Sequence, residues 1–428
     1  MQLSKPRTRF YACGTVYRQF LWDVLAQSIH RGDDLPKFEA AAAQHFGSAH
    51  AVTVPMARVG IYLCLRYYLQ AGQLVVTSPY TLAEVINMIV CAGGTPRFVD
   101  IDRNNAHLDP EKLAQCTEDN IGAILVTHLH GIPADMRPIL EIAKARGIPV
   151  IEDAAQSAGA KYDGRYVGTL GNAGVFSFGI LKQLNSIYGG MVLTDDADLA
   201  AFLRKELAEF APVGIGTLAD KLAYLGRNHF LTTNPIFSLG TFPLLRHGVL
   251  HDVDWINRLV TVETDLRLKH EIDHWYRHRF SASQARMLQR QLPHLAKHDQ
   301  QRIKHGQAYL ELLSDVPDLV LPKVSQKGQA TFAHFPVQVS DPPNLLRWFN
   351  FYGQDVVIQH FSNCAELPCF RDYRRDCPVA AEVAKSMVLM PTYPDFGMHN
   401  VRRNAQIVRK YFEAGQPKFD GTNRLQID

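Results

Sequence analysis

The stretches VIEDAAQ at residues 150–156 and FSFGILK at residues 176–182 decide the fold of this chain. Each begins as a short apolar run and continues into polar side chains. Three similar runs precede them: LVVT at 74–77, RFVD at 97–100 and AILV at 123–126. Short apolar runs that alternate with helix-length segments are typical of a largely parallel sheet buried on both faces. The sequence therefore predicts an α/β fold.

Helices are expected between these runs, and two of them have clear helical spacing. They cover residues 82–92 and 136–146. The second ends at Gly147, with Lys144 and Arg146 in its last turn, as a helix C-terminus should. Both are expected to be crossover helices of the parallel sheet.

The second half of the chain has a different pattern, which predicts a second domain. One long helix is expected from Ser281 to Leu313, followed by a strand near residues 333–337 and a closing helix near 401–412. We therefore expect a large domain with a mostly parallel central sheet, residues 1–294, and a smaller C-terminal α+β domain, residues 295–428. Residues 208–275 fit neither pattern and are expected to be an insertion in the large domain.

The composition is that of a folded soluble protein. Of the 428 residues, 46% are hydrophobic and 20% are charged, which excludes intrinsic disorder and a multi-span membrane protein. The net charge of +3 is too dilute to indicate a nucleic-acid partner. The longest uncharged stretch, residues 230–245, contains Pro235, Gly240 and Pro243, so no transmembrane segment is expected.

The cysteines favour a reducing compartment. There are seven, an odd number, and none forms a C-x-x-C pair. Neither a disulfide framework nor a zinc site is indicated, and no metal is expected at His360, Cys364, Cys369 and Cys377. The first residues also lack the apolar core of a signal peptide. A cytoplasmic location is expected.

The two deciding stretches place an acid and a lysine after neighbouring strands. Asp153 ends the first run, and Lys182 follows Ser177 by five residues. Ligands of parallel sheets bind at the carboxyl ends of the strands. There, a carboxylate can keep a pyridine nitrogen protonated, and a desolvated lysine can hold an aldehyde as an imine. The pair indicates pyridoxal 5'-phosphate (PLP), although Asp153 alone is more typical of a capping or structural acid, and Lys182 alone is no different from a surface lysine.

The chain from about residue 35 to 200 resembles the DegT-type sugar aminotransferases, PLP enzymes of fold type I. The resembling motifs occur in the same order: Phe38-Glu39, FVDID at 98–102, HLHGIPADM at 128–136, EDAAQ at 152–156, Val167-Gly168 with Leu170-Gly171, S-F-x-x-x-K at 177–182, and Gly189-Gly190. The resemblance implies a homodimeric aminotransferase with sites at the subunit interface. Its substrates would be a small-molecule amino donor such as glutamate and a keto acceptor, expected to be a nucleotide-linked sugar.

The resemblance also implies roles for individual residues. Lys182 matches the lysine that forms the Schiff base and moves the proton, and Asp153 matches the partner of the pyridinium nitrogen. Gln156 matches the residue that lies against the ring, and Ser177 matches a hydroxyl donor to the phosphate. For Gln156 and Ser177 the alternative is ordinary turn or cap hydrogen bonding.

Other cofactor positions depart from the family pattern. Ala57 and Arg58 stand where the family presents backbone amides to the phosphate; Arg58 adds a charge there, unless it is simply an exposed arginine. The aromatic residue over the ring aligns with Leu82, with Tyr80 two residues earlier. Arg277 aligns with an asparagine that, in relatives, reaches the partner subunit's phosphate.

Alternatives to this function remain open. The acceptor can be a non-sugar carbonyl, on a cyclitol, a lipid or a natural-product intermediate, or the chain can be a non-catalytic PLP-binding regulatory protein. A sugar dehydratase is disfavoured because such relatives replace the lysine with histidine. Residues 221–250 are expected to form a cap that packs on the large domain or the dimer partner, or else a surface that recognises an apolar or lipid-linked acceptor. Other membrane contact is not expected.

Overall fold

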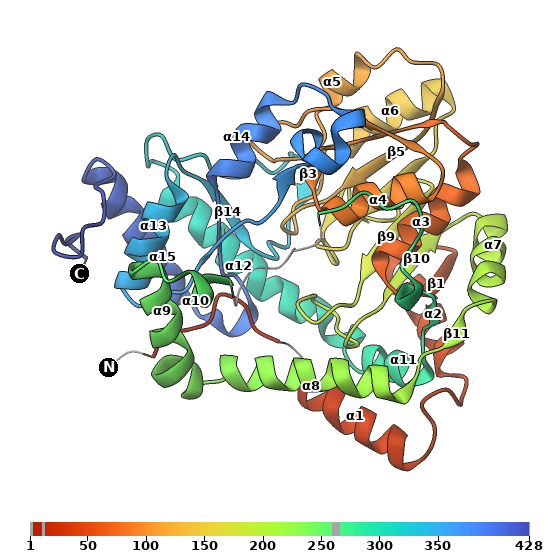
Figure 1. Cartoon of the computed structure of the whole chain (residues 1–428), viewed down its shortest axis with the longest axis horizontal. Helices are drawn as coiled ribbons and strands as arrows, with labels where there is room; N and C mark the ends of the chain where they lie inside the picture. The colour runs from red at the N-terminus through yellow and green to blue at the C-terminus, as the bar shows by residue number, and fades with distance from the viewer. Residues whose placement is uncertain (1–2, 11–12, 259–265, 428) are drawn as a thin grey trace.

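The computed structural model describes residues 3–10, 13–258 and 266–427 (Figure 1). Its centre is a seven-stranded sheet in the order β1-β10-β9-β6-β5-β2-β4. The strands are β1 (His50–Val54), β2 (Leu74–Thr77), β4 (Thr95–Phe98), β5 (Ile121–Thr127), β6 (Val150–Asp153), β9 (Ala173–Ser177) and β10 (Gly190–Thr194). The five from β4 to β9 are parallel to one another, and β10 is antiparallel to both of its neighbours. The α/β prediction is confirmed, and each predicted run overlaps a strand, although β4 begins two residues before the predicted run 97–100 and ends at Phe98.

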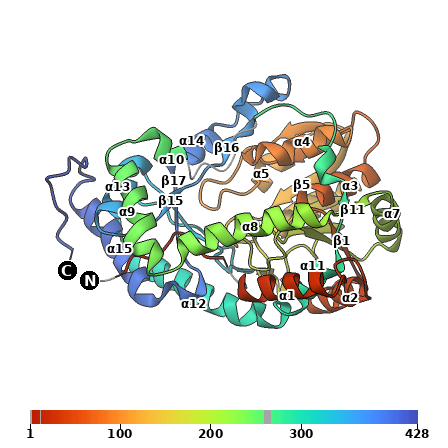
Figure 2. The same ribbon diagram turned by 60° about the horizontal axis from the view of Figure 1, so that its bottom comes forward.

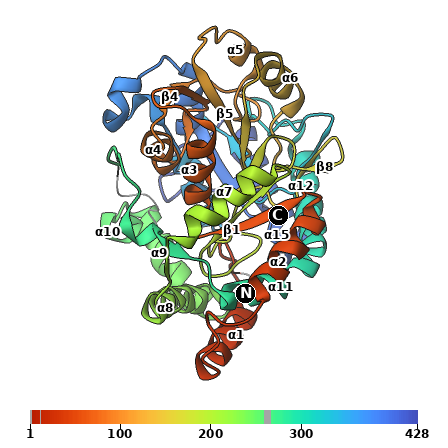
Figure 3. The ribbon, with the colours of Figure 1, turned by 90° about the vertical axis from the view of Figure 1, so that its right-hand side faces the viewer.

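Helices cover both faces of this sheet, as the apolar runs predicted. Adjacent strand residues enter opposite cores: Val75 and Leu125 pack in one, and Val76 and Val126 in the other. Figure 3 shows α3 and α4 on one side of β1 and α2 and α11 on the other. The helices of this part are α1 (Cys13–Leu25), α2 (Asp34–Phe46), α3 (Ala57–Tyr68), α4 (Ala83–Cys91), α5 (Pro110–Ala114), α6 (Met136–Arg146), α7 (Ala197–Ala208) and α11 (Ala282–Gln289).

The two predicted crossover helices are confirmed. α4 lies within one residue of its predicted ends, and α6 has the predicted bounds. Gly147 ends α6 with φ of 65°, a left-handed conformation that glycine adopts without strain.

The single long helix predicted from Ser281 to Leu313 is wrong. The segment is α11, then a 3₁₀ turn at Leu292–His294, then α12 (Leu295–Leu313). Pro293 lies inside that turn. A proline has no N–H for the helical ladder and its ring crowds the preceding turn, so the helix breaks there.

The C-terminal part is a small antiparallel sheet packed against helices. The sheet order is β14-β17-β15, and residues of β14, β17, α13 and α15 form most of a third core. The elements are β14 (Phe335–Gln338), β15 (Val357–Ile358), β17 (Met387–Met390), α13 (Pro342–Phe351), α14 (Pro378–Ser386) and α15 (Met398–Glu413). The predicted boundary at 294/295 coincides with the start of α12, and the division into two domains stays a prediction.

Short ladders and the N-terminal residues join the two parts. β16 (Ser362–Asn363) pairs with β3 (Tyr80–Thr81), and β13 (Gly328–Gln329) extends the hairpin of β7 (Lys161–Tyr162) and β8 (Arg165–Tyr166). Arg7 pairs with Asp355 at 2.6 Å. One further ladder pairs β11 (Ala211–Pro212) with β12 (His278–Arg279).

The segment predicted to be an insertion is largely helical. It contains α8 (Ile215–Thr232), a π-helical turn at Phe237–Thr241, α9 (Phe242–Leu250), α10 (Asp254–Arg258) and a 3₁₀ turn at His274–Tyr276, whereas residues 259–265 lie outside the described residues. Figure 2 shows α8 running beside α1 toward α9. α8 packs on α1, and α9 packs on α13. None of the described helices is both long and apolar enough to cross a membrane.

A close backbone contact between β9 and the loop before it gives a first test. A β-carbon at Gly174 would lie 2.0 Å from the carbonyl oxygen of Gly168, which cannot rotate away. Gly174→Ala should therefore destabilise the fold by about 1–3 kcal/mol, the usual cost of overpacking. Gly216→Ala, where a β-carbon meets nothing within 4 Å, is the control. Equal midpoints of thermal unfolding for the two variants would contradict this prediction.

Candidate active site

The carboxyl ends of β6 and β9 bring Asp153, Ser177 and Lys182 to one edge of the sheet. β6 ends at Asp153, which pairs in register with Val175 of β9. After β9, the Lys182 N–H donates to the Gly179 carbonyl at 3.0 Å, so the chain turns back toward Ser177. A β-carbon placed at Gly179 would lie 3.7 Å from Ser177 Oγ and 3.9 Å from Lys182 Cγ.

The buried acid and the lysine influence each other's protonation. Burial raises the pKa of Asp153, while a hydrogen bond from the Ala155 N–H at 3.0 Å and the charge of Lys182 lower it. Burial lowers the pKa of Lys182, the charge of Asp153 raises it, and the charge of Arg58 lowers it again. The result is a lysine whose neutral, nucleophilic form is more accessible than in water.

Asp153 also has an oxygen to offer a ligand. Its Oδ1 accepts the Ala155 N–H. Its Oδ2 makes no hydrogen bond among the described residues and is not fully enclosed. One oxygen is therefore fixed by the backbone, and the other is available to a positively charged ring N–H.

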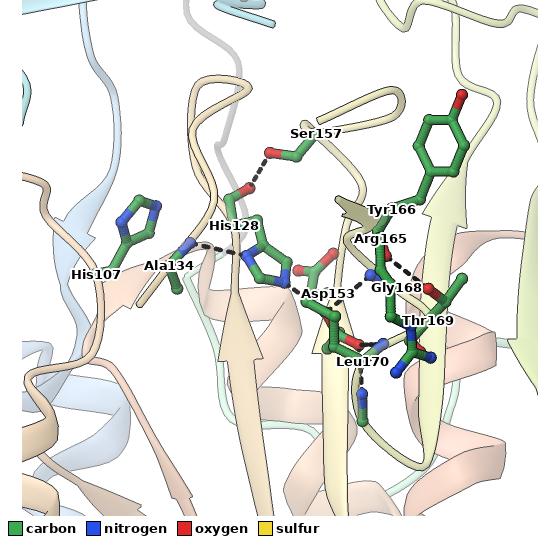
Figure 4. A network of polar contacts seen from close by, with 12 residues as sticks. His107, His128, Ala134, Asp153, Ser157, Arg165, Tyr166, Gly168, Thr169 and Leu170 are labelled. Atoms are coloured by element: carbon green, nitrogen blue, oxygen red, sulfur yellow. Dashed lines mark hydrogen bonds and ion pairs between the residues drawn. The ribbon is translucent and has the colours of Figure 1, made fainter. Parts of the chain in front are cut away.

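The preceding residue, Glu152, is a fully buried carboxylate at the centre of a polar network (Figure 4). Its two oxygens accept four hydrogen bonds of 2.7–2.9 Å, from His128 Nε2 and from the N–H groups of Gly168, Leu170 and Gly171. His128 Nδ1 accepts the Ala134 N–H at 3.0 Å, so the proton of a neutral His128 is on Nε2, where it donates to Glu152. Glu152 thereby fixes the loops on both sides of Asp153.

The turn that follows Asp153 is tied to the same loop. The Gln156 side-chain oxygen accepts the His130 N–H at 3.0 Å, and Ser157 Oγ donates to the His128 carbonyl at 2.9 Å. The Leu129 N–H donates to His107 Nε2 at 3.0 Å. The structure therefore holds Gln156, which is partly buried, beside the end of β6.

Ala57 and Arg58 lie at the start of α3, close to the end of the sheet. The helix begins there without a side-chain cap, and a β-carbon at Gly190 would lie 2.6 Å from the Ala57 nitrogen. Arg58 Nη1 donates to the Tyr276 hydroxyl at 2.7 Å and lies 3.4 Å from Glu84. The alternative of a simply exposed Arg58 is therefore wrong, because its guanidinium is paired.

The partners of Arg58 were not found from the sequence. Glu84 is 8% exposed, and its second oxygen lies 2.5 Å from Lys269 Nζ, which also meets Asp273 at 2.9 Å. These residues come from segments more than 180 positions apart, and no local motif connects them. His334 was not predicted, and His360 was considered only as a metal ligand; the pKa values of both are lowered by burial and then by the charge of Lys182.

The remaining predicted cofactor residues lie in different environments. Tyr80 is fully buried, with its ring edge against Phe361 at 5.6 Å. Leu82 is partly exposed at the start of α4, and Arg277 is exposed. The cofactor roles of these three residues stay predictions.

The sequence pattern of the DegT/DnrJ/EryC1/StrS aminotransferase family matches residues 19–228 and 257–409. The chain belongs to this family. It is a PLP-dependent aminotransferase, and the predictions of family, enzyme class, fold type and cofactor are confirmed.

Individual relatives extend this comparison. The pleiotropic regulatory protein of Geobacillus stearothermophilus is 29% identical over 371 residues, 85% of each chain. The spore coat polysaccharide biosynthesis protein SpsC of Bacillus subtilis is 36% identical over 177 residues, 41% of this chain and 46% of that protein. The crystal structure of an aminotransferase from Psychrobacter cryohalolentis has a similar fold, with a TM-score of 0.75 at 20% identity over 96% of this chain and 99% of the other.

The hydrogen bonds to Glu152 predict that an amide side chain at residue 152 lowers the stability of the fold. In Glu152→Gln, the NH₂ group would face two donors that now share one oxygen, and each unpaired donor costs about 1–3 kcal/mol. The variant should unfold at lower temperature and lose activity. Asp163→Asn makes the same change at an exposed surface ion pair, where the expected effect is within about 1 kcal/mol. An equal loss in both variants would show that the network does not hold the site.

Asp153 raises the pKa of Lys182 and Arg58 lowers it, so removing either charge should shift this pKa in opposite directions. With cofactor removed, Asp153→Asn loses a negative charge, so the pKa of Lys182 should fall and its amine should react at lower pH. Arg58→Gln loses a positive charge, so the pKa should rise. The measurement is acylation of Lys182 by a small neutral reagent, read by peptide mass spectrometry, with the 82% exposed Lys418 as internal control. Shifts of the same sign would contradict the assignment.

Proposed function

We propose that this enzyme transfers the amino group of an amino acid such as glutamate to the keto group of a nucleotide-linked sugar. The observation that carries the proposal is the placement of Asp153 and Lys182 at the carboxyl ends of β6 and β9, close enough that the charge of each shifts the pKa of the other. Family membership and the partial similarity to SpsC, named for polysaccharide biosynthesis, support a sugar acceptor.

The residues at this edge fit PLP. The free oxygen of Asp153 would accept the N–H of the pyridinium ring, and Lys182, whose pKa is lowered by burial, would hold the aldehyde carbon covalently. When bound, the cofactor supplies an electron sink for the carbon that loses its proton. Lys182 Nζ would move that proton as a general base and acid, a task that suits its lowered pKa.

The other predicted residues would surround the ring and the phosphate. Gln156 would lie against the ring, and Ser177 Oγ would donate to the phosphate together with the N–H groups at Ala57 and Arg58. The Arg58 guanidinium adds positive charge on that side. The partly exposed Leu82 can contact the ring directly, whereas the fully buried Tyr80 supports that wall from the core.

We further propose a homodimer in the cytoplasm. Arg277 would contact the phosphate held by the partner subunit, and its exposed position suits this. The six cysteines with described side chains are all free thiols, as expected in a reducing compartment. The small-molecule donor and acceptor are the expected substrates, and no nucleic acid is expected.

Two alternatives carry weight. The acceptor carbonyl can belong to a cyclitol, a lipid or a natural-product intermediate instead of a sugar. A regulatory role is favoured by one observation, the name of the Geobacillus stearothermophilus relative. The nucleophilic lysine beside a buried acid, which a binding protein does not need, favours catalysis.

The assignments of Lys182 and Asp153 predict different losses. Lys182→Ala should leave no cofactor attached to the protein after borohydride reduction and should abolish turnover. Asp153→Asn should still bind the cofactor but transfer amino groups at least about 100-fold more slowly, because a neutral amide holds no ring proton. The measurements are protein mass after reduction and keto-acid release from glutamate. Covalent attachment in Lys182→Ala, or near-normal turnover in Asp153→Asn, would refute the respective role.

The acceptor is tested separately by following amine formation on nucleotide-linked keto sugars and on non-sugar ketones. Faster amination of a nucleotide-linked sugar is expected. If keto acid is released but only non-sugar ketones are aminated, the sugar acceptor is wrong and the acceptor is a cyclitol, a lipid or a natural-product intermediate.

A further inference from the structure

A cavity of about 620 Å³ lies between residues 3 and 4, α9, the end of α13 and Arg403 of α15. This volume is in the range of small-molecule sites, roughly 300–1,000 Å³. Apolar side chains that include Leu239, Phe242 and Phe351 line much of it. None of the residues that influence the pKa of Lys182 lines this cavity. Figures 1 and 2 place α9, α13 and α15 far from α3 and β1.

One wall of the cavity lies outside the family match. The family match stops at residue 228 and resumes at 257. The lining residues from Ser238 to His251 all lie in this interval. The family's common reaction therefore does not account for this wall.

The cavity is positively charged. Arg246, His247, His251 and Arg403 line it, and no Asp or Glu is among its described lining residues. The nearby Asp252 pairs with Arg347 of α13. A ligand that enters the cavity would therefore meet cationic and imidazole groups without a competing carboxylate in the lining.

Arg246, which lines this cavity, has an N–H group without a hydrogen-bond partner among the described residues. Its Nη2 donates to the Phe351 carbonyl at 3.1 Å, and its guanidinium lies 5.9 Å from the centre of the Phe351 ring. Its Nε is buried and has no hydrogen-bond partner among the described residues. A buried donor without a partner is costly, and an anionic acceptor removes that cost.

We propose that this cavity binds an amphiphilic anion, a phosphate or carboxylate that carries an apolar chain or ring, at a site separate from the transamination centre. The anionic group contacts Arg246 and His247. The apolar part lies against Phe242, Phe351 and Leu239, whose side chain is 69% exposed at the opening. The anion is either a free small molecule or the headgroup end of a lipid.

The test measures binding of octyl phosphate, below its micelle concentration, to the cofactor-loaded enzyme by calorimetry. Wild type should bind it at least tenfold more tightly than octyl glucoside, which lacks the anionic group, or inorganic phosphate, which lacks the apolar chain. Arg246→Ala should weaken binding at least tenfold, and Arg246→Lys should restore part of it. Leu239→Glu should also weaken binding, by charge repulsion at an exposed position where folding is not at risk.

Arg227→Ala is the matched control, because Arg227 is an exposed arginine of the same insertion that stacks on Tyr224 outside the cavity. Its affinity should equal that of wild type. The proposal is overturned if wild type does not bind octyl phosphate, if octyl glucoside binds equally, or if Arg246→Ala binds as well as Arg227→Ala.

Vesicles distinguish the two sources of the anion. Cosedimentation with phosphatidylcholine vesicles that contain phosphatidic acid, lost in Leu239→Glu, would identify a lipid headgroup. Octyl phosphate binding without cosedimentation would identify a free amphiphile. Because neither measurement involves amino transfer, failure of the proposed sugar transamination would leave this result unchanged.

Discussion

The buried charge of Glu152 is the constraint on which the site depends. A carboxylate with no access to water is tolerated only where strong donors surround it, and Glu152 has four. These donors come from the loop before β9 and from the loop after β5, so satisfying one charge fixes both loops. Because successive strand residues point to opposite faces, fixing Glu152 also fixes the direction of Asp153. The residue that prepares the site thus faces away from it.

Next to this edge of the sheet, Arg58 belongs to a set of ion pairs that extends beyond the proposed cofactor site. Arg58 is paired with Glu84, and Glu84 is shared with Lys269. The guanidinium is therefore held in place without a ligand, which would lower the conformational entropy that binding of the proposed phosphate must remove. At the same time its charge favours the neutral amine of Lys182. In the proposed binding mode, one side chain would therefore connect the phosphate to the nucleophile.

The sequence predicted what local pattern determines. Apolar runs located the strands, Gly147 located the end of α6, and EDAAQ with Ser177 and Lys182 located the reactive edge. The break at Pro293 was missed because helical spacing continues on both sides of the proline. Glu84, Tyr276, His334 and His360 were missed for a different reason. They reach the site only through tertiary packing, and the neighbouring predictions at Leu82 and Arg277 did not extend to them.

The attachment of the N-terminus has a consequence for the order of assembly during synthesis. The Arg7 N–H donates to Asp355 at 2.9 Å, 348 positions away, and the Pro6 carbonyl accepts the Tyr393 hydroxyl. At a translation rate of about 5–20 residues per second, these partners are synthesised roughly 20–70 s after Pro6 and Arg7. The central sheet can form in that interval, but these two bonds cannot. The bonds that hold Pro6 and Arg7 are therefore among the last to form, although both residues precede every strand of the central sheet in the chain, and the cavity beside α9, which Leu3 and Ser4 line, lies directly next to this late contact.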